Sequence, residues 1–587
     1  MKYRWLLEYI LIFLVSLYAS FLWFKPVMWD LAWDAHTQED VVKSIFFTTS
    51  EREHFLGNGV DLAGTIWIFD RVGQVFSGDS GTFIPEIFAP FGYDWGKHEG
   101  FAWGDSLFAL PLMLFIPTPG WYNLHLLLTL TFGYFGCYLL YKTAGAPRLL
   151  AIGLSALSIN SEFIQHEVFR GRPTQIHLLF HVFFLMSVLR VLEIHNNRKK
   201  AWLWSTLGGI SGAGMLMVYW FGGVAVGFSA GIAILLMGWK RNVTSKIRRF
   251  LWMAFISVGI PLAITWRVSK EFLMGNGESL FDEMSEEPAY VLDLVLWSIP
   301  IQKFKYLERW SDLETVFFDA KIPLLLLGIT LTCAIFNPFG WRRRWGWVIA
   351  FIIALGIPLP PSLIWDGGWF INGHAFLQSI FPPLLRCAFP ERMVVAPILF
   401  MGIICGLSSR SFLQNIKIPW LKPFCAIAIA LPILYHIPTT FPSHVETPTS
   451  HLSINPILMQ ATKKWPGGII HIPLIEGSDT AHIEQMYHKQ PIMGGPGMDA
   501  LISEEQEQYI EENSFLSALH TLSRSRVSTL PSYDMKDLKK LHDDGFRLVY
   551  INTRRTQNAA DTFQRFFGSS GLLQNSGLLA VPLPTPQ

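Results

Sequence analysis

The chain has 587 residues, of which 51% are hydrophobic and only 16% charged, and its formal net charge at pH 7 is +1. Soluble proteins carry about 25% charged residues, so this chain has too few charges to cover a water-exposed surface of its size. The near-neutral balance excludes a strongly basic protein, and no nucleic-acid partner is expected. The 23 Trp residues favour a membrane protein, because Trp is enriched at membrane–water interfaces.

Eleven apolar segments predict helices that cross a membrane, since a spanning helix needs about 20 apolar residues. The first has no small-residue cleavage site after it, so we expect a retained signal anchor. The predicted spans are 5–24, 121–141, 148–165, 174–192, 202–218, 220–238, 250–268, 322–338, 345–360, 393–409 and 420–437. The run Leu107–Ile116 is too short to cross, and we expect a re-entrant or interfacial segment there.

Basic residues cluster at alternate ends of these spans. Lys and Arg are enriched in cytoplasmic loops, and a cytoplasmic N-terminus places every cluster on that side. The clusters include Lys2 and Arg4, Lys142 and Arg148, Arg198–Lys200, Lys240–Arg249, Arg342–Arg344 and Arg410–Lys422. The expected location is the inner (plasma) membrane, with residues 25–120, 269–321, 361–392 and the tail outside the cytoplasm.

The sequence predicts a transmembrane domain over 1–437 and a small extracytoplasmic α/β domain over 438–587. A Pro-rich linker is expected at Ile437–Pro442. The tail patterns then predict two strands and two helices, the second helix ending at a glycine. The strands are Gly468–Leu474 and Phe546–Ile551, and the helices are Glu504–Leu522 and Met535–Asp544.

Signatures of soluble enzymes are missing from the sequence. It has no Walker-type phosphate loop, no nucleophile elbow and no HExxH motif. Its five cysteines form no CxxC pair, and none follows Cys425, so they predict neither a metal site nor a disulfide framework.

Carboxylates concentrate in the long loop after the first span. Asp61 follows a glycine turn and precedes an apolar helix, and further polar residues follow at Glu86, Asp94, His98, Glu99 and Asp105. A divalent cation bound by these residues is left open, because their spacing is not diagnostic of a metal site. His166, His177 and His181 lie near one helix face, where packing or hydrogen bonding is expected.

Several segments carry a family resemblance. They are Phe88–Trp95 (FAPFGYDW), Phe389–Met393 (FPERM), Gly468–Leu474 (GIIHIPL), Met486–Gly495 (MYHKQPIMGG) and Gly545–Ile551 (GFRLVYI). Over its whole length the chain resembles bacterial membrane glycosyltransferases of the GT-C type, the superfamily of protein O-mannosyltransferases and lipid A aminoarabinose transferases. The expected fold is therefore a polytopic α-helical GT-C-like membrane protein.

The resemblance implies a polyprenyl-phosphate sugar donor at the outer membrane face and a catalytic acidic residue in the first outer loop. Asp61 matches that position best and is the expected general base. The acidic pair familiar in the family is not intact there, because Leu62 follows Asp61. Glu39-Asp40 is such a pair in a less regular stretch.

The chemistry suggests further roles. A base must remove the acceptor's proton, and arginine suits the leaving phosphate because it donates two parallel hydrogen bonds. Arg170, Arg172 and Arg392 are therefore expected to bind the donor phosphate. Trp67 is expected to contact substrate, together with Glu86, Asp94, His98 and Glu99.

Simpler roles stay open for the same residues. Asp61 also suits a helix N-terminus, and the arginines also suit lipid headgroups. The leading hypothesis is transfer of a sugar to an extracytoplasmic lipid, polysaccharide or protein. The alternatives are a transporter or flippase of a lipid-linked substrate, and a non-catalytic membrane scaffold.

Overall fold

The computed structural model describes most of the chain. The described residues are 4–25, 53–57, 60–77, 83–94, 104–116, 120–194, 197–238, 243–274, 341–357, 362–365, 368–371, 393–441, 449–452, 456–474, 481–494, 503–526, 531–554, 556, 560–567, 573–575 and 577–585. The chain divides into two compact units. The helical unit contains Met1–Phe47 and Glu99–Pro448, and the tail unit contains Thr48–His98 and Thr449–Gln587. Part of the first predicted outer loop thus groups with the tail.

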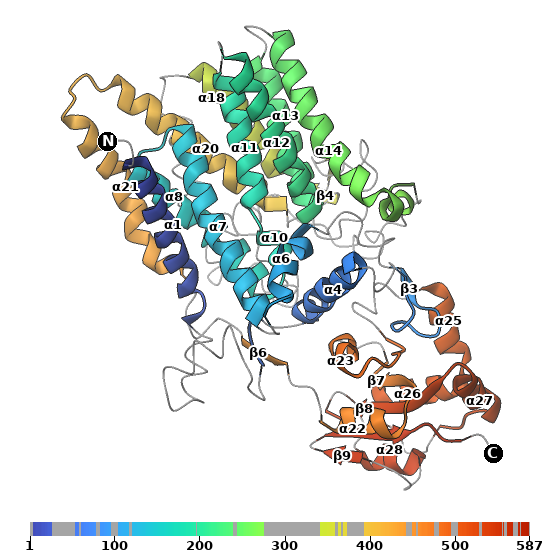
Figure 1. The fold of residues 1–587 in the computed structure, drawn as a ribbon. Helices are drawn as coiled ribbons and strands as arrows, with labels where there is room; N and C mark the ends of the chain where they lie inside the picture. The colour runs from blue at the N-terminus through green and yellow to red at the C-terminus, as the bar shows by residue number, and fades with distance from the viewer. Residues whose placement is uncertain are drawn as a thin grey trace. The chain divides into compact units, whose positions relative to one another are not determined.

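The helical unit is a bundle of apolar helices (Figure 1). Its helices are α1 (Arg4–Leu22), α6 (Gly104–Met113), α7 (Gly120–Ala144), α8 (Arg148–Ile159), α9 (Glu162–Phe169), α10 (Pro173–Ile176), α11 (Leu179–Glu193), α12 (Arg198–Val218), α13 (Trp220–Gly238), α14 (Val243–Met274), α18 (Trp341–Gly356), α20 (Val395–Asn415) and α21 (Leu421–Thr440). A hairpin of β4 (Ser362–Trp365) and β5 (Gly368–Ile371) belongs to the same unit.

Six stretches of described helix are long and apolar enough to cross a membrane: Gly120–Ala144, Pro173–Glu193, Arg198–Val218, Trp220–Met237, Ser245–Ile264 and Val395–Asn415. Four shorter apolar helices accompany them: Leu6–Leu22, Arg148–Ile159, Trp345–Gly356 and Leu421–Tyr435. The chain is therefore a multi-pass membrane protein, as predicted. The predicted span 322–338 lies outside the described residues.

Two predicted spans contain breaks in the structure. Helix α8 ends at Ile159, and α9 begins after Ser161, so 148–165 is not one helix. Its 12 residues reach about 18 Å, less than the about 30 Å of a bilayer core. The predicted helix 174–192 leaves helical geometry at His177 (ψ 78°), between α10 and α11. The first break coincides with the polar residues Asn160, Ser161 and Glu162, whereas the second is marked in the sequence by His177 just before a run of apolar residues.

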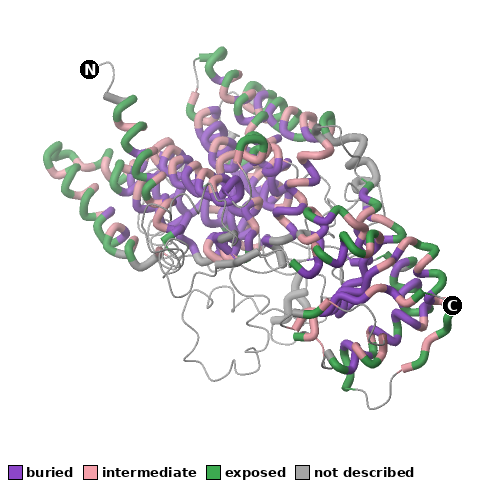
Figure 2. Tube along the Cα trace, turned by 60° about the horizontal axis from the view of Figure 1, so that its bottom comes forward, coloured by how far each residue is buried: buried purple, intermediate pink, exposed green. Residues whose placement is uncertain are grey.

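Small residues allow α12 to approach its neighbours closely. A Cβ added to Gly212 would lie 2.0 Å from Oγ of Ser257 on α14, and one added to Gly208 would lie 2.8 Å from Cβ of Ser187 on α11. Such glycines let helix backbones pack tightly within a membrane. Figure 2 shows the buried residues gathered in the middle of this bundle.

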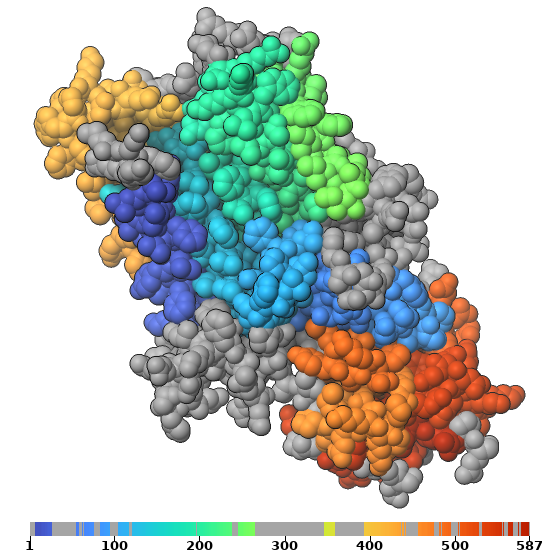
Figure 3. Space-filling model, viewed as in Figure 1, coloured from blue at the N-terminus to red at the C-terminus, as the bar shows by residue number. Residues whose placement is uncertain are grey.

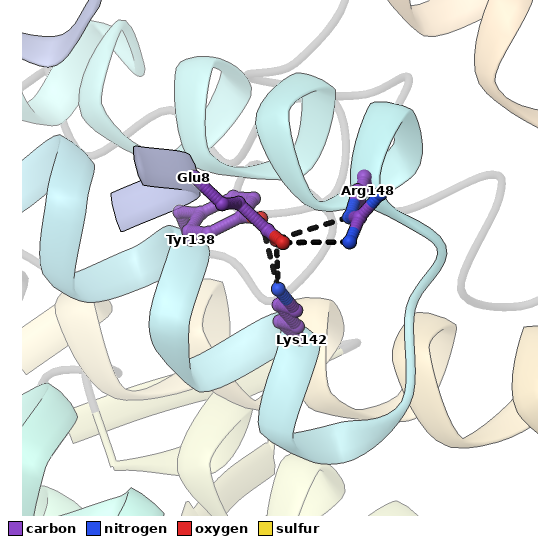
Figure 4. A network of polar contacts seen from close by, with 4 residues as sticks. All are labelled: Glu8, Tyr138, Lys142 and Arg148. Carbon is purple, nitrogen blue, oxygen red and sulfur yellow. Dashed lines mark hydrogen bonds and ion pairs between the residues drawn. The ribbon is translucent and has the colours of Figure 1, made fainter. Parts of the chain in front are cut away.

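Glu8 links α1 to the turn between α7 and α8 (Figure 4). Its carboxylate accepts hydrogen bonds from Arg148 (Nη2 at 2.6 Å and Nε at 3.0 Å), from the Tyr138 hydroxyl at 2.9 Å, and from Lys142. Charged groups in membrane helices are costly unless paired. This network explains how the first apolar helix accommodates a glutamate.

The tail unit is built on a four-stranded sheet in the order β7-β8-β10-β9. Strand β7 (Gly468–Ile472) runs parallel to β8 (Phe546–Asn552), and the other pairings are antiparallel. The remaining strands are β10 (Leu578–Pro582) and β9 (Leu573–Asn575), with short pairs β1–β6 (Glu53–Leu56, Thr449–Leu452) and β2–β3 (Phe83–Ile84, Tyr93–Asp94). The helices are α4 (Val60–Ser77), α22 (Pro456–Lys464), α23 (Ala481–His488), α25 (Glu504–Glu512), α26 (Ser514–Arg524), α27 (Met535–Asp543) and α28 (Ala560–Phe567).

The tail predictions agree with this sheet and differ in two details. The helix predicted over 504–522 is interrupted at Asn513, whose side chain accepts hydrogen bonds from the backbone N–H groups of Phe515 and Leu516 and so caps α26. The predicted linker at 437–442 is wrong over its first part, because α21 continues to Thr440 and contains Pro438. Proline is tolerated in membrane helices, where neighbouring groups satisfy the freed backbone.

Candidate functional site

A buried carboxylate in the helical unit contacts two histidines. Oδ1 of Asp105, in the first turn of α6, lies 3.0 Å from Nδ1 of His177 and 2.9 Å from Nε2 of His125. All three residues are at most 1% exposed. We call these three residues the Asp–His cluster.

The local fold explains why these side chains meet. Gly104 begins α6, and a Cβ there would lie 3.0 Å from backbone and side-chain carbons of Met217, so α6 packs closely against the end of α12. His125 lies early in α7, and His177 occupies the break between α10 and α11. An acidic residue in the first turn of α6 is also favoured by the helix dipole.

The protonation of the cluster follows from its geometry. Burial raises the pKa of Asp105, but the charge and hydrogen bonds of the two imidazoles outweigh this and hold it well below its usual range. An ionised carboxylate only accepts hydrogen bonds, so Nδ1 of His177 carries the proton that it shares with Asp105. A neutral His177 then has its lone pair on Nε2.

Two polar atoms of the cluster have no hydrogen-bond partner among the described residues. They are Oδ2 of Asp105 and Nε2 of His177, and both are buried. The rings of Phe108 and Phe180 lie 5.0 and 5.4 Å from that of His177. A histidine that is oriented by a carboxylate and has an open Nε2 is the arrangement of a general base.

Two of the three predicted phosphate-binding arginines lie on the segment that leads to His177. Arg170 caps the C-terminus of α9 and is exposed. Arg172 is partly buried, and its Nη1 lies 3.5 Å from Oε2 of the buried Glu167. Gly171 between them has φ +75°, which a larger residue would rarely adopt. Arg392 lies outside the described residues.

The other predicted site residues fall in the tail unit or outside the description. Asp61 is the second residue of α4, and its side chain is not among those described. Trp67 is buried in α4, and Glu86 is half-buried in the turn after β2. Asp94 ends β3, with its side chain outside the description. His98 and Glu99 also lie outside the described residues.

Arg71 is a buried charge of the tail unit. Its Nη2 donates a 2.8 Å hydrogen bond to Gln485 on α23, and its guanidinium lies 5.5 Å from the ring centroid of Trp67. Burial lowers its pKa, and the charges of Glu86 and Asp70 oppose that shift. Arginine stays charged in proteins, so this contact joins α4 to α23.

Two segments quoted for the family resemblance also meet in the tail unit. The backbone N–H of Ile492 donates to the carbonyl of Glu86 at 2.7 Å, and Ala89 returns a bond to Ile492 at 3.0 Å. Phe88 adds a bond to Gly494 at 3.1 Å. The FAPFGYDW segment is therefore held against the segment containing PIMGG.

No family model matches the sequence, and no curated protein matches it. Solved structures do match. The structure resembles the arabinofuranosyltransferase AftD from Mycobacteria at 12% identity with a TM-score of 0.51, over 94% of this chain and 37% of that one. This chain therefore shares its fold with that arabinofuranosyltransferase over the aligned residues. Other matches are the oligosaccharyltransferase of Archaeoglobus fulgidus (11% identity, 92% and 68% of the two chains, TM-score 0.48) and ArnT from Cupriavidus metallidurans (13%, 99% and 99%, TM-score 0.39).

Sequence patterns alone did not predict how the Asp–His cluster assembles. Asp105 was expected among the loop carboxylates and His177 in packing or hydrogen bonding, but His125 was not singled out. The signal for His125 was a polar pair, Asn123 and His125, inside a predicted membrane span, where buried polar groups are costly.

Among the residues that the structure describes, no group of three His, Cys, Asp or Glu side chains is placed to hold a metal ion. The divalent cation considered for the outer loop stays a prediction, because His98 and Glu99 lie outside the described residues.

Proposed function

We propose that this protein transfers a sugar from a polyprenyl-phosphate-linked donor to an extracytoplasmic acceptor, a lipid, a polysaccharide or a protein. The observation that carries the proposal is the buried Asp–His cluster in the helical unit of a GT-C-like fold. Ionisable residues buried among membrane helices mark functional sites. The neighbouring loop with Arg170 and Arg172 supplies cations suited to a phosphate.

The reaction has a simple proton balance. The acceptor oxygen bonds to the anomeric carbon while the bond from that carbon to the phosphate oxygen breaks. The phosphate leaves with the electron pair, and the acceptor proton passes to a base. In the structure-based assignment His177 Nε2 takes that proton, while Asp105 holds the opposite nitrogen and stabilises the imidazolium that forms.

The family resemblance assigns the same role to Asp61 instead. Variants separate the two assignments. We expect His177→Gln and Asp105→Asn to reduce transfer from polyprenyl-phosphate sugars by about 100-fold or more, with the full-length protein still folded. Asp61→Asn tests the other base, and His166→Gln on α9 serves as a histidine control.

The outcomes are distinct. If the cluster variants lose transfer activity and Asp61→Asn keeps it, His177 is the base. If Asp61→Asn loses transfer activity and the cluster variants keep it, Asp61 is the base. If both sets remain fully active, neither residue is the base. If the wild-type protein transfers or hydrolyses nothing across a panel of polyprenyl-phosphate sugars, the enzyme assignment fails and a non-catalytic scaffold is favoured.

A flippase or transporter of a lipid-linked substrate is the second candidate. It is favoured by the interruption between α10 and α11 at His177, because transporters place ionisable groups at broken helices. Reconstituted vesicles distinguish the two. Movement of a labelled polyprenyl-phosphate sugar across the bilayer without transfer supports the transporter.

The proposed topology places the protein in the inner membrane, with a cytoplasmic N-terminus and an extracytoplasmic tail unit. The positive-inside distribution of Lys and Arg supports it. Labelling of cysteines introduced at positions 2 and 585 with a membrane-impermeant reagent tests it. Labelling of the tail position only after the cells are permeabilised would contradict the proposal.

A further inference from the structure

Helices α12 and α14 run side by side in the same direction. Trp202 of α12 faces Trp252 of α14 with ring centroids 6.3 Å apart, and the Trp252 indole donates to Thr206 at 3.1 Å. One turn further, Ser257 Oγ lies 3.2 Å from the carbonyl of Gly209. Because the residue numbers of the contacting positions increase together along both helices, the two helices are parallel and their N-termini lie at the same end of the bundle.

The face of α14 that packs on α12 begins with two cations. Met253 packs against Gly208 of α12, and Lys246 and Arg249 precede Met253 by seven and four positions, which places them on the same helix face. The register of Met253 with Gly208 sets Lys246 opposite the fully buried Ala201 and sets Arg249 opposite Trp204, next to the fully buried Ser205. Two cations therefore line the start of the seam between the two helices.

Arg249 is the unexplained member of this pair. It is only 6% exposed, and its Nε has no hydrogen-bond partner among the described residues. Lys246, one turn away, is half-buried and carries the same charge. A buried guanidinium is costly unless an anion or acceptor satisfies it.

Other charges at this end reinforce the need for an anion. Arg198, Lys199 and Lys200 begin α12, and both helix N-termini carry partial positive charge. The nearby carboxylate of Glu193, at the end of α11, is already paired with Arg410 at 2.6 Å and Arg190 at 3.7 Å. Positive charge at the seam is thus in excess among the described residues.

An apolar surface continues from this cationic end. Leu203 on α12 and Leu251 and Phe255 on α14 are 58%, 64% and 67% exposed. The Trp252 and Phe255 rings stack with centroids 5.8 Å apart. Figure 3 shows α14, in light green, beside the blue-green helices on the surface of the bundle. A charged end followed by an apolar strip matches a phospholipid, with a phosphate headgroup and acyl chains.

We propose that the start of the α12–α14 seam binds the phosphate of an anionic phospholipid through Arg249 and Lys246, with the acyl chains on the adjoining apolar strip. This site differs from the Asp–His cluster. Met217, next to α6, lies near the C-terminus of α12, whereas the seam begins near Ala201 at its N-terminus, about 24 Å away along the helix axis. The lipid site therefore does not depend on the proposed transferase activity.

Native mass spectrometry of the full-length protein tests this proposal. We expect the wild-type protein to retain phosphatidylglycerol in preference to phosphatidylcholine, and Arg249→Gln to weaken that retention by about tenfold or more. Lys246→Gln should weaken it less. Lys422→Gln, which removes an exposed basic residue of α21, is the matched control and should leave retention unchanged.

Further measurements separate the loss of charge from misfolding and show whether the ligand is a lipid or free phosphate. Arg249→Lys keeps the charge and should retain phosphatidylglycerol within a few-fold of wild type, which guards against a misfolded Arg249→Gln variant. Failure of millimolar inorganic phosphate to displace the lipid supports the lipid as ligand. Displacement by inorganic phosphate, equal retention of phosphatidylcholine, or an unchanged Arg249→Gln variant would overturn the proposal.

Discussion

Asp105 and His177 form a buried carboxylate–imidazole pair, with Oδ1 3.0 Å from Nδ1, although they are 72 residues apart in the chain. The pair joins the start of a short helix, α6, to a break in a long apolar segment. An ionised Asp105 fixes the proton of His177 on Nδ1 and leaves Nε2 open. The first prediction tests whether this geometry serves catalysis.

Replacing Asp105 by Asn removes the charge that stabilises a protonated His177. We expect the single-turnover transfer rate to fall by about 100-fold or more, while binding of the polyprenyl-phosphate donor changes by no more than a few-fold. If the rate matches the wild type, the pair has a structural role only.

Replacing Arg71 by Met should loosen α4 from α23 in the tail unit. The change leaves the buried Gln485 without its 2.8 Å donor, and an unsatisfied buried polar group costs about 1–3 kcal/mol. Hydrogen exchange of α4 and α23 amides in the full-length protein should therefore accelerate. Arg565→Met, at an exposed position of α28, is the control, and equal exchange in both variants would contradict the assignment.

Replacing Glu8 by Gln should destabilise the helical unit (Figure 4). The carboxylate compensates Lys142 and Arg148 at once, and hydrogen bonds to charged groups contribute about 1.5–3 kcal/mol. Unfolding by SDS titration should show a loss of that order. Glu193→Gln, which removes a half-exposed partner of Arg410, should cost less than about 1 kcal/mol. Equal losses of stability in the two variants would show that Glu8 contributes no more than an ordinary surface ion pair.

The free energy of unfolding of the tail unit should vary with pH because of His471 in β7. Burial, with the neighbouring His488 and His482, lowers the pKa of His471 to about 3, whereas an unfolded histidine titrates near about 6.5. Between these values the unfolded state binds more protons, so the free energy of unfolding falls as the pH is lowered, by up to about 1.4 kcal/mol per pH unit.

His471→Leu removes this titration. Hydrogen exchange of β7 and β8 amides, followed from about pH 7 to pH 4 and corrected for the intrinsic exchange rate, should show a smaller loss of stability in this variant than in wild type. His542→Gln, on α27 outside this group of histidines, is the control. A wild-type slope in His471→Leu would mean that another group controls the acid sensitivity.

Much of the architecture was predictable because it depends on local patterns. Ten of the eleven predicted spans overlap apolar helices, and the strands at 468 and 546 follow from short apolar runs. The candidate site was predictable only in its parts. Asp105, His177, Arg170 and Arg172 were each named, but nothing in their spacing indicated that the first two touch or that Arg172 pairs with Glu167.

The sequence by itself determined that this is a helical membrane protein with a small α/β tail, because hydropathy and strand or helix periodicity act over a few neighbouring residues. Tertiary structure alone decided that Asp105 meets His125 and His177, that an apolar run breaks at His177, and that residues 48–98 group with the tail. These outcomes depend on which buried polar groups form hydrogen bonds with one another across distant segments. A hydropathy value describes each residue separately and contains no information about its partner.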